Sequence, residues 1–443
     1  MTTSTVDPLR AFPIRPVSLP PFVADRQALG IFSVMDFGAK GDAVTDDTAA
    51  IQTAINAAQA VGGAGGAIVY FPVGQYKTSA PLVVSASGIV LQGAGRLSST
   101  IFSTVNGQDI LHLTGTAPAP IAYGAVRDLQ FSSSNVNAGH CIFATYCQVW
   151  IYEDLQLQSA GGDGIHLDSN CYLTGISNCR AHNLGGAAFF LGVDSNAVRL
   201  VGCEANLCKY GVQIGIAGNN GSLSFGIAII GGSCEGCSSG QIAIYYARAV
   251  EITGVDLEQG NGVIIGDPAS AATAVYGVSV SSCNFEDTNA GTVITVQRAL
   301  GVSIKGNLFS WTTGDTATPI TVATTASGVV IESNAYQTAQ TVVNNAGLAC
   351  KRVNDGFSAA TQGWGAATPA RPAGTGAANA VQNTNPYPVR IYKAGASGTH
   401  IIDPGGNTVA LPADPTEFIL DPGAEVWYQT TVATAWNWYG CNG

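Results

Sequence analysis

The sequence predicts an all-β protein whose main part is a right-handed, single-stranded parallel β-helix with an N-terminal capping helix and a small C-terminal β domain. Composition is the first observation behind this fold class. Glycine occupies 55 of 443 positions, hydrophobic residues make up 46% of the chain and charged residues only 11%. Small and β-branched residues favour strands joined by tight turns over helices. The second and third observations are a repeated phrase and a short apolar strand that follows each copy of it.

The repeated phrase is seven residues long and recurs from residue 176 onward. Its copies are "ISNCRAH", "LVGCEAN", "IIGGSCE", "ITGVDLE", "VSSCNFE" and "IKGNLFS". Successive copies start 24, 29, 23, 28 and 24 residues apart, an interval typical of stacked solenoid coils. A coil of this kind buries its inward side chains only against its neighbours, so the fold must form by stacking.

The remaining elements follow in chain order. Residues 1–30 are rich in proline and predict an arm or attachment segment, and the parallel β-helix is predicted over residues 31–350. Within it, Thr45 or Asp46 can cap a helix that ends at Gly62 and Gly63, before the strand "AIVYFP". The apolar positions of this helix are Ala50, Ile51, Ala54, Ile55 and Ala58. Residues 351–385 predict a Gly/Ala/Pro-rich linker, and residues 386–443 the small C-terminal β domain.

The eleven cysteines are explained by the repeat. Cys179, Cys203 and Cys283 share one column, and Cys234 occupies an inward column. The same inward column holds Leu257, Phe285 and Phe309. We therefore expect buried, free thiols. Cys234 and Cys237 form a CxxC, but no second pair at metal-site spacing follows, so we expect no metal site and no cofactor.

Charge narrows the range of partners. The net charge is -11, and the 18 basic residues form no run, so nucleic acid and acidic membrane surfaces are excluded as partners. No stretch is long and apolar enough to span a membrane. No secretory signal is visible at the N-terminus. A neutral polysaccharide is the partner that this composition favours.

The segment "DFGAKGDAVTDDTAAIQTAINAA", followed by "GGAIVYFPVGQYKTSAPLVV" and "IVLQGAG", resembles the N-terminal signature of the pectate-lyase-like right-handed β-helix superfamily. That superfamily includes polygalacturonases, polysaccharide lyases and bacteriophage tailspike depolymerases. With the coils, the resemblance covers about residues 31–345. It implies that the helix caps the first coil. It also assigns capping and turn roles to the aspartates of this segment, which are Asp36, Asp42, Asp46 and Asp47.

The resemblance separates the branches of the superfamily by their motifs. Of the polygalacturonase motifs, "GGDGIH" offers only Asp163, and no cluster of acidic calcium ligands with a following arginine marks a pectate lyase. The proline-rich arm, the short chain and the terminal β module look most like a phage tailspike. This likeness implies a homotrimer that acts on bacterial surface glycans, located in the virion tail or outside the cell.

Alignment of the repeats predicts the candidate catalytic residues. Glu235, Glu258 and Glu286 fall in one outward column on three consecutive coils, and Asp256 lies two residues before Glu258. Coils about 4.8 Å apart offer both the close carboxylate pair of retaining glycosidases and the wider pair of inverting ones. We predict Glu258 as the general acid, with Glu235 or Asp256 activating water. Solvation or cation binding by the glutamate column is one alternative, and a catalytic site elsewhere in the chain or between subunits is the other.

Histidines and aromatic residues complete the predicted site. His166, His182, Trp150, Tyr246 and Trp311 are candidates for sugar binding. His166 should lie in register with Gln213, Ala243 and Ile264, so a solvated outer-face histidine is its alternative role. A polysaccharide lyase would instead use residues such as His166, His182, Arg180 and Lys209. A non-catalytic glycan receptor or adhesin, and a secreted cell-wall enzyme, are the remaining alternatives.

Overall fold

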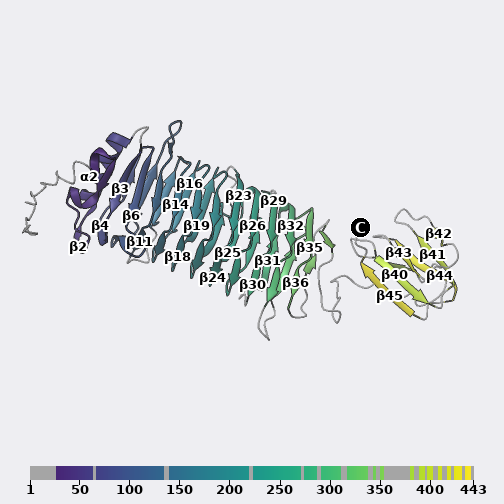
Figure 1. Cartoon of the computed structure of the whole chain (residues 1–443). Coiled ribbons are helices and arrows are strands. Elements are labelled where there is room, and N and C mark those ends of the chain that lie inside the picture. The colour runs from purple at the N-terminus through teal and green to yellow at the C-terminus, as the bar shows by residue number, and fades with distance from the viewer. Residues whose placement is uncertain are drawn as a thin grey trace, which may run out of the picture.

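The computed structural model describes residues 26–443, with gaps at 63–65, 134–138, 219–222, 271–273, 287–290, 311–316, 338–342, 346–349, 354–379, 384–388, 395–396, 403–407, 412–416, 421–423, 432–434 and 441–443. Its main part is a stack of parallel strands that begins beside a single long helix (Figure 1). Three long parallel sheets form the walls of the stack. The predicted parallel β-helix is therefore confirmed.

Sheet A has thirteen strands. They are β1 (Ile31–Ser33), β3 (Ala67–Phe71), β6 (Ile89–Gly93), β10 (Ala125–Arg127), β14 (Ile151–Glu153), β17 (Gly175–Ser177), β20 (Arg199–Val201), β23 (Ser224–Ile230), β26 (Ala247–Thr253), β29 (Val275–Ser281), β32 (Ala299–Lys305), β35 (Val329–Glu332) and β38 (Cys350–Val353). Two shorter strands, β9 (Ile121–Ala122) and β13 (Cys147–Gln148), pair with each other.

Sheet B has twelve strands, and it contains the last three residues of each repeated phrase. They are β2 (Asp42–Asp46), β4 (Gly74–Thr78), β7 (Ser99–Ser103), β11 (Gln130–Ser133), β15 (Gln156–Gln158), β18 (Arg180–His182), β21 (Glu204–Asn206), β24 (Ser233–Glu235), β27 (Asp256–Glu258), β30 (Asn284–Glu286), β33 (Leu308–Ser310) and β36 (Ala335–Tyr336). Most of these strands have only three residues, with the middle one buried.

Sheet C has eleven strands and closes each coil. They are β5 (Leu82–Val84), β8 (Leu111–Thr114), β12 (Ile142–Thr145), β16 (Ile165–Ser169), β19 (Ala187–Val193), β22 (Tyr210–Ile214), β25 (Gly240–Ile244), β28 (Val263–Ile265), β31 (Thr292–Val296), β34 (Thr318–Val322) and β37 (Val343–Asn345). Along β8, β12 and β16, buried residues alternate with partly exposed ones, as expected for strands that face a core on one side, whereas β25 is buried along its whole length.

The helix α2 (Thr48–Gly62) covers the open end of the first coil, after the short 3-10 helix η1 (Val34–Phe37). Its core-facing residues, Ile51, Ala54, Ile55 and Ala58, are fully buried. The backbone N–H of Thr48 donates to Asp46 Oδ1 over 3.1 Å, so Asp46 is confirmed as a cap. Thr45 is not a cap, because its hydroxyl donates to Asp42 instead.

The other aspartates near the helix hold turns, as the resemblance implied. Asp47 accepts hydrogen bonds from the backbone N–H groups of Lys40 and Gly41, at 2.7 and 2.9 Å. Asp36 forms an ion pair with Arg26 at 2.8 Å. Since each carboxylate is engaged by the backbone or by a neighbouring side chain, this end of the solenoid carries structural rather than catalytic acids.

The sharp turns that lead from sheet A to sheet B lie above one another on successive coils. The first residue of each turn has a left-handed backbone, as at Gly202 with φ of 61°, and the next residue points inward. The predicted column Cys179, Cys203 and Cys283 occupies these inward positions and is buried. Later coils continue it with two buried asparagines. Asn307 Nδ2 donates to Asn334 Oδ1 over 2.9 Å, so the turns are joined from coil to coil by side-chain amides.

The core of the solenoid is one continuous hydrophobic cluster. Inside sheet B, Cys234 and Leu257 lie in register, as do Phe285 and Phe309. The rings of these two phenylalanines stack with centroids 4.9 Å apart. The nine cysteines from Cys141 to Cys283 are buried and free, as expected. Cys350 is buried as well, while Cys441 lies outside the described residues.

Beyond β38, the described chain forms two antiparallel sheets with their own small core. The four-stranded sheet contains β39 (Val381–Gln382), β44 (Glu425–Thr431), β41 (Ser397–Ile402) and β42 (Thr408–Ala410), and the three-stranded sheet contains β43 (Glu417–Leu420), β40 (Val389–Ala394) and β45 (Ala435–Gly440). Their core includes Ile391, Leu420 and Val426. The limits of the arm, the linker and this domain remain predictions.

No helix among the described residues is long and apolar enough to cross a membrane.

Candidate functional site

The outer face of sheet B is a polar platform. Because each strand has three residues with the middle one buried, its first and third side chains point outward in two parallel columns. From β11 to β33 these columns are Gln130, Gln156, Arg180, Glu204, Ser233, Asp256, Asn284 and Leu308, and Ser132, Gln158, His182, Asn206, Glu235, Glu258, Glu286 and Ser310. Fifteen of these sixteen side chains carry hydrogen-bonding groups, and Leu308 is the sixteenth.

The predicted glutamate column is confirmed in its register. Glu235 pairs with Glu258, and Glu258 pairs with Glu286 on the next coil. Asp256 lies in the neighbouring column beside Ser233 and Asn284. Neighbouring strands are about 4.8 Å apart, so the backbone positions of the three glutamates are separated by about that distance from one coil to the next.

Amide side chains orient two of these carboxylates. Asn206 Nδ2 donates to Glu235 Oε2 over 2.7 Å. Asn284 Nδ2 donates to Asp256 Oδ1 over 2.9 Å and contacts Glu286 Oε2 at 3.5 Å. A neutral amide fixes the position of a carboxylate without neutralising its charge, so like charges remain stacked along the face.

Glu258 bears the consequence of this stacking. A hydrogen bond with Asp256 raises the pKa of Glu258 above its usual value, and burial and repulsion from Asp256, Glu286 and Glu235 raise it further. A carboxyl group with a raised pKa retains its proton closer to neutral pH, which is the property required of a general acid.

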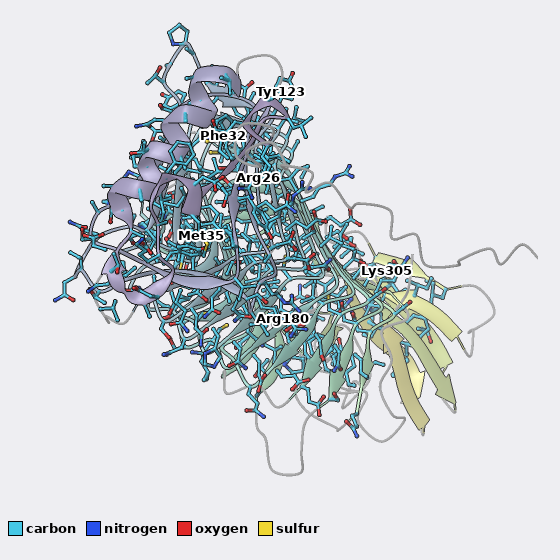
Figure 2. All side chains as sticks on the ribbon, turned by 60° about the vertical axis from the view of Figure 1, so that its left-hand side comes forward. Arg26, Phe32, Met35, Tyr123, Arg180 and Lys305 are labelled. Carbon is cyan, nitrogen blue, oxygen red and sulfur yellow. The ribbon has the colours of Figure 1, made fainter. Side chains whose placement is uncertain are left out.

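The charge of the platform changes sign along the stack. Arg180 and His182 lie on β18, and the Arg180 guanidinium contacts Glu204 Oε2 on the next coil at 3.0 Å. Arg180 lies at the outer surface of the solenoid (Figure 2). Arg180 therefore lies between the neutral side chains of β11 and β15 and the acidic residues that begin with Glu204 on β21.

A second polar group lies on the outer face of sheet C. His140 precedes β12, Asp163 precedes β16, and His166 is on β16. Asp163 Oδ2 lies 2.6 Å from His166 Nδ1 and 3.3 Å from His140 Nδ1, while Asp163 Oδ1 accepts a hydrogen bond from the backbone N–H of Ala187 at 2.5 Å. We call His140, Asp163 and His166 the histidine cluster.

Charges within the histidine cluster are paired. Burial alone would raise the pKa of Asp163, but the contact with His140 and the hydrogen bond from His166 hold it at about 2. Burial would lower the pKa of His166, but hydrogen bonds to Asp163 and Asp168 raise it to about 9. At neutral pH His166 is therefore an imidazolium beside an aspartate, and it cannot act as a ready proton acceptor.

Aromatic rings enclose His166. Its ring stacks on Phe190 with centroids 4.3 Å apart and on Phe143 with centroids 5.2 Å apart. The predicted register of His166 with Gln213, Ala243 and Ile264 is confirmed through Phe190. With both ring faces covered, His166 can offer only the edge of its ring to a ligand.

The prediction of sugar binding is wrong for two aromatic residues, because both are buried. Trp150 is fully buried, because the preceding turn directs its ring inward, and its Nε1 donates to the carbonyl of Ile121 at 3.3 Å. Tyr246 is buried as well, and its hydroxyl donates to Asp267 Oδ2 at 3.0 Å. Trp311 lies outside the described residues. His182 is exposed on β18 and remains a candidate.

The analysis of the sequence missed Asp109, His112 and His140. His112 Nε2 lies 2.7 Å from Asp109 Oδ2, and Asp109 Oδ1 accepts a hydrogen bond from the backbone N–H of His140. The signal that could have found them is an Asp-x-x-His motif that occurs at residues 109–112 and again at 163–166. Its two copies lie two coils apart on sheet C.

Comparison with known proteins confirms the resemblance. Residues 31–118 match the family described as Rhamnogalacturonase A/epimerase, pectate lyase-like. Mannuronan C5-epimerase AlgE4 of Azotobacter vinelandii is 38% identical over 118 residues, which are 24% of this chain and 20% of that protein. Alginate lyase 7 of the same organism is 43% identical over 84 residues, 18% of this chain and 9% of that protein. The chain thus spans a fifth or less of the length of these relatives.

Solved structures extend the likeness to the rest of the fold. ORF18 of Geobacillus virus E2 has a TM-score of 0.55 at 14% identity, over 94% of this chain and 77% of that chain. The A-module of the Azotobacter vinelandii epimerase AlgE4 has a TM-score of 0.53 at 20% identity, over 72% of this chain and 99% of that chain. At these identities the likeness establishes the fold.

Proposed function

Because its opening coils match the pectate-lyase-like family and its fold is a parallel β-helix, we propose that this protein is a polysaccharide-degrading enzyme. It hydrolyses glycosidic bonds of an extended glycan bound along the outer face of sheet B. The observation that carries this proposal is the stack of Glu235, Glu258 and Glu286 on consecutive coils of a polar platform. Glycoside hydrolysis requires two carboxyl groups of different protonation state near one bond.

The platform suits a glycan with few charges. Amide and hydroxyl groups can both donate to and accept from sugar hydroxyls, and carboxylates accept from them. These groups line sheet B from β11 to β33. A polyanionic chain would meet the glutamate column and a net charge of -11, which repel it. We therefore propose a neutral or weakly charged polysaccharide of a bacterial surface as the substrate.

The contacts of each carboxylate suggest its role. Glu258 is the proposed general acid, because the neighbouring acids raise its pKa. Glu235 is the proposed second carboxylate, because Asn206 fixes its position on the adjacent coil. Asp256 is bonded to Asn284 and shares a hydrogen bond with Glu258, so it supports the acid. A pair about 4.8 Å apart is closest to the retaining separation of about 5 to 5.5 Å.

We also propose a phage-type setting for the enzyme: a homotrimeric tailspike in the virion tail, or an enzyme outside the cell. Two solved structures of similar fold are phage proteins, ORF18 of Geobacillus virus E2 and the bacteriophage phi29 gene product 12. The first match covers 94% of this chain. Light scattering on the full chain tests the oligomer, because a trimer supports the tailspike setting and a monomer contradicts it.

The activity is tested on a panel of capsular, O-antigen, plant and alginate polysaccharides. Reducing ends and the ultraviolet absorbance of unsaturated uronates are read together. Hydrolysis predicts new reducing ends without absorbance. Absorbance that rises with the reducing ends would contradict hydrolysis and indicate β-elimination. Binding without release of any product would indicate a glycan receptor.

A uronate-modifying enzyme is the second candidate. Its support is the similarity of the opening coils to mannuronan C5-epimerases and to alginate lyase 7. The groups available for it are the histidine cluster on sheet C and, one coil further along, Arg180 and His182 on sheet B. Because His166 has a raised pKa, it would act here as a proton donor or as a cation beside the uronate. Proton NMR of alginate after incubation detects epimerisation, which the panel above does not.

A further inference from the structure

We propose that His140 Nδ1, His166 Nδ1 and Asp163 Oδ2 form a binding site for one divalent transition-metal ion, of the class of Zn²⁺ or Ni²⁺. This site is separate from the glutamate column and does not rest on the proposed hydrolysis. It departs from our expectation of no metal site, which rested on the spacing of the cysteines and on the lack of an acidic calcium cluster in the sequence.

The geometry of the donor atoms comes first. Within the described residues, these three side chains have ligand atoms that all lie within 4.8 Å of one another. His140 Nδ1 lies 3.3 Å from Asp163 Oδ2, about the separation of two ligands of a tetrahedral ion with bonds of about 2.0 to 2.1 Å. His166 Nδ1, now at 2.6 Å from the same oxygen, must move outward by less than about 1 Å.

Neighbouring groups hold the ligands in place. The backbone N–H of Ala187 occupies Asp163 Oδ1, which leaves Oδ2 for the ion. The backbone N–H of His140 is held by Asp109 at 2.7 Å. A Cβ atom at Gly186 would lie 2.1 Å from Asp163 Oδ1, so this glycine gives the carboxylate its room. Such supporting hydrogen bonds are typical of metal ligands.

The surroundings favour a cation and leave it accessible. Asp109, Asp163 and Asp168 place three carboxylates around the imidazoles. The side chains of His140 and His166 are 23% and 14% exposed, so an ion can enter from solvent and keep water ligands. Two histidines, one carboxylate and open positions form a ligand set that first-row transition metals prefer.

Binding exchanges two hydrogen bonds for metal coordination. In the ion-free cluster the proton of His166 Nδ1 points to Asp163 Oδ2. On binding, the Nδ1 lone pair must face the ion, so this proton leaves to solvent from an imidazolium, or moves to Nε2 in a neutral ring. Nε2 lies 3.7 Å from Asp168 Oδ1. The His140 Nδ1 lone pair carries no proton, but in the ion-free cluster it accepts from the backbone N–H of Asp163. It must release that N–H in order to face the ion.

The chain contains a matched control. Asp109 and His112 repeat the Asp-x-x-His motif, and their side chains also form a close pair at 2.7 Å. The residue that stacks on His112 from the preceding coil is Val83, which offers no ligand atom. His112→Ala therefore removes a similar dyad from the same sheet without removing a ligand of the proposed site.

The test uses the full chain without an affinity tag, stripped with a chelator and titrated calorimetrically with ZnCl₂ and NiCl₂. One ion per chain is expected for the unmodified protein and for His112→Ala. His140→Ala and His166→Gln should weaken binding by at least about ten-fold, with circular dichroism showing that the fold is retained. Because Asp163 is buried, Asp163→Asn serves as a third variant only if it folds.

Cobalt provides an independent readout. Co²⁺ bound at this site should give visible absorption bands of nitrogen and oxygen ligation, and these bands should vanish in His140→Ala. Absence of binding by the unmodified protein would overturn the proposal. Binding that survives His140→Ala and His166→Gln, or that is lost equally in His112→Ala, would overturn it as well.

Discussion

The glutamate column on sheet B and the histidine cluster on sheet C are built on the same scaffold but handle charge in opposite ways. The column stacks Glu235, Glu258 and Glu286, three like charges. The cluster alternates acids and imidazoles, so that Asp163 lies against His166 at 2.6 Å. Stacking like groups raises the pKa of the middle one, Glu258, whereas alternating acids with imidazoles pairs opposite charges. One arrangement is poised for proton transfer, and the other stabilises the coils and can accept a cation.

Removing the proposed acid should have the largest effect. Glu258→Gln keeps the shape of the side chain but supplies no transferable proton, so hydrolysis should fall by about 100- to 10,000-fold. The rate of reducing-end release measures this. Glu204→Gln is the control, since Glu204 lies on the same face but is paired with Arg180. Equal losses in the two variants would mean that the face, rather than Glu258, is responsible.

Removing the central acid of the cluster should act on stability instead. Asp163→Ala leaves an imidazolium and the N–H of Ala187 without their partner, which should lower the free energy of unfolding by about 3 to 5 kcal/mol. Urea denaturation of chelator-treated protein measures the change. Glu286→Ala on the exposed column should stay within about 0.5 kcal/mol. A comparable loss in both variants would contradict the contrast between the two sites.

The pH dependence should reveal the coupling within the column. Since Glu258 acts protonated, activity should fall as pH rises through its raised pKa. The same shift means that the folded state favours the protonated form, so this group's stabilisation is present below its unfolded pKa and is lost as pH rises through the folded one. Asp256→Asn removes the largest cause of the shift and should move the alkaline limb of the rate profile to lower pH. Glu286→Gln should move it less. If the alkaline limb of the rate profile were unchanged in Asp256→Asn, Glu258 would not be the group whose protonation controls the reaction.

Removing the amide that positions Glu235 should have the smallest effect on the rate of hydrolysis. Asn206→Ala removes the amide that holds Glu235 at 2.7 Å, and because the carboxylate itself remains, kcat should fall by about ten-fold or less. KM should change little if Asn206 only positions Glu235. A rise in KM without a change in kcat would show that Asn206 binds the glycan directly.

The sequence predicts the register of residues inside the repeats, but it does not predict the side-chain directions at the turns between them. The register of Glu235, Glu258 and Glu286 was predictable, because a repeat of constant phase places equivalent residues on one another. The burial of Trp150 was not, since a left-handed residue, Val149 with φ of 55°, turns the chain just before it. Counting alternation along a strand cannot anticipate such a turn.

The histidine cluster was missed for a related reason. The cluster joins two coils: His140 and Asp163 lie in the turns that precede β12 and β16, and His166 lies on β16. In these turns loop lengths vary and the repeat loses its phase. The pairing of Asp163 with His166 was visible as the Asp-x-x-His spacing, but the third member required the register of β12 with β16. The local motif could therefore be recognised in the sequence, whereas the contact between the two turns could be recognised only in the structure.

The most direct test of the account is the crystal structure of the Glu258→Gln protein bound to an oligosaccharide of the polysaccharide that the unmodified enzyme degrades. We predict that the sugar chain lies along sheet B, with a glycosidic oxygen within hydrogen-bonding distance of residue 258 and Glu235 facing the anomeric carbon. An oligosaccharide bound instead on sheet C, with its scissile bond beside His166, would contradict the assignment of catalysis to the glutamate column.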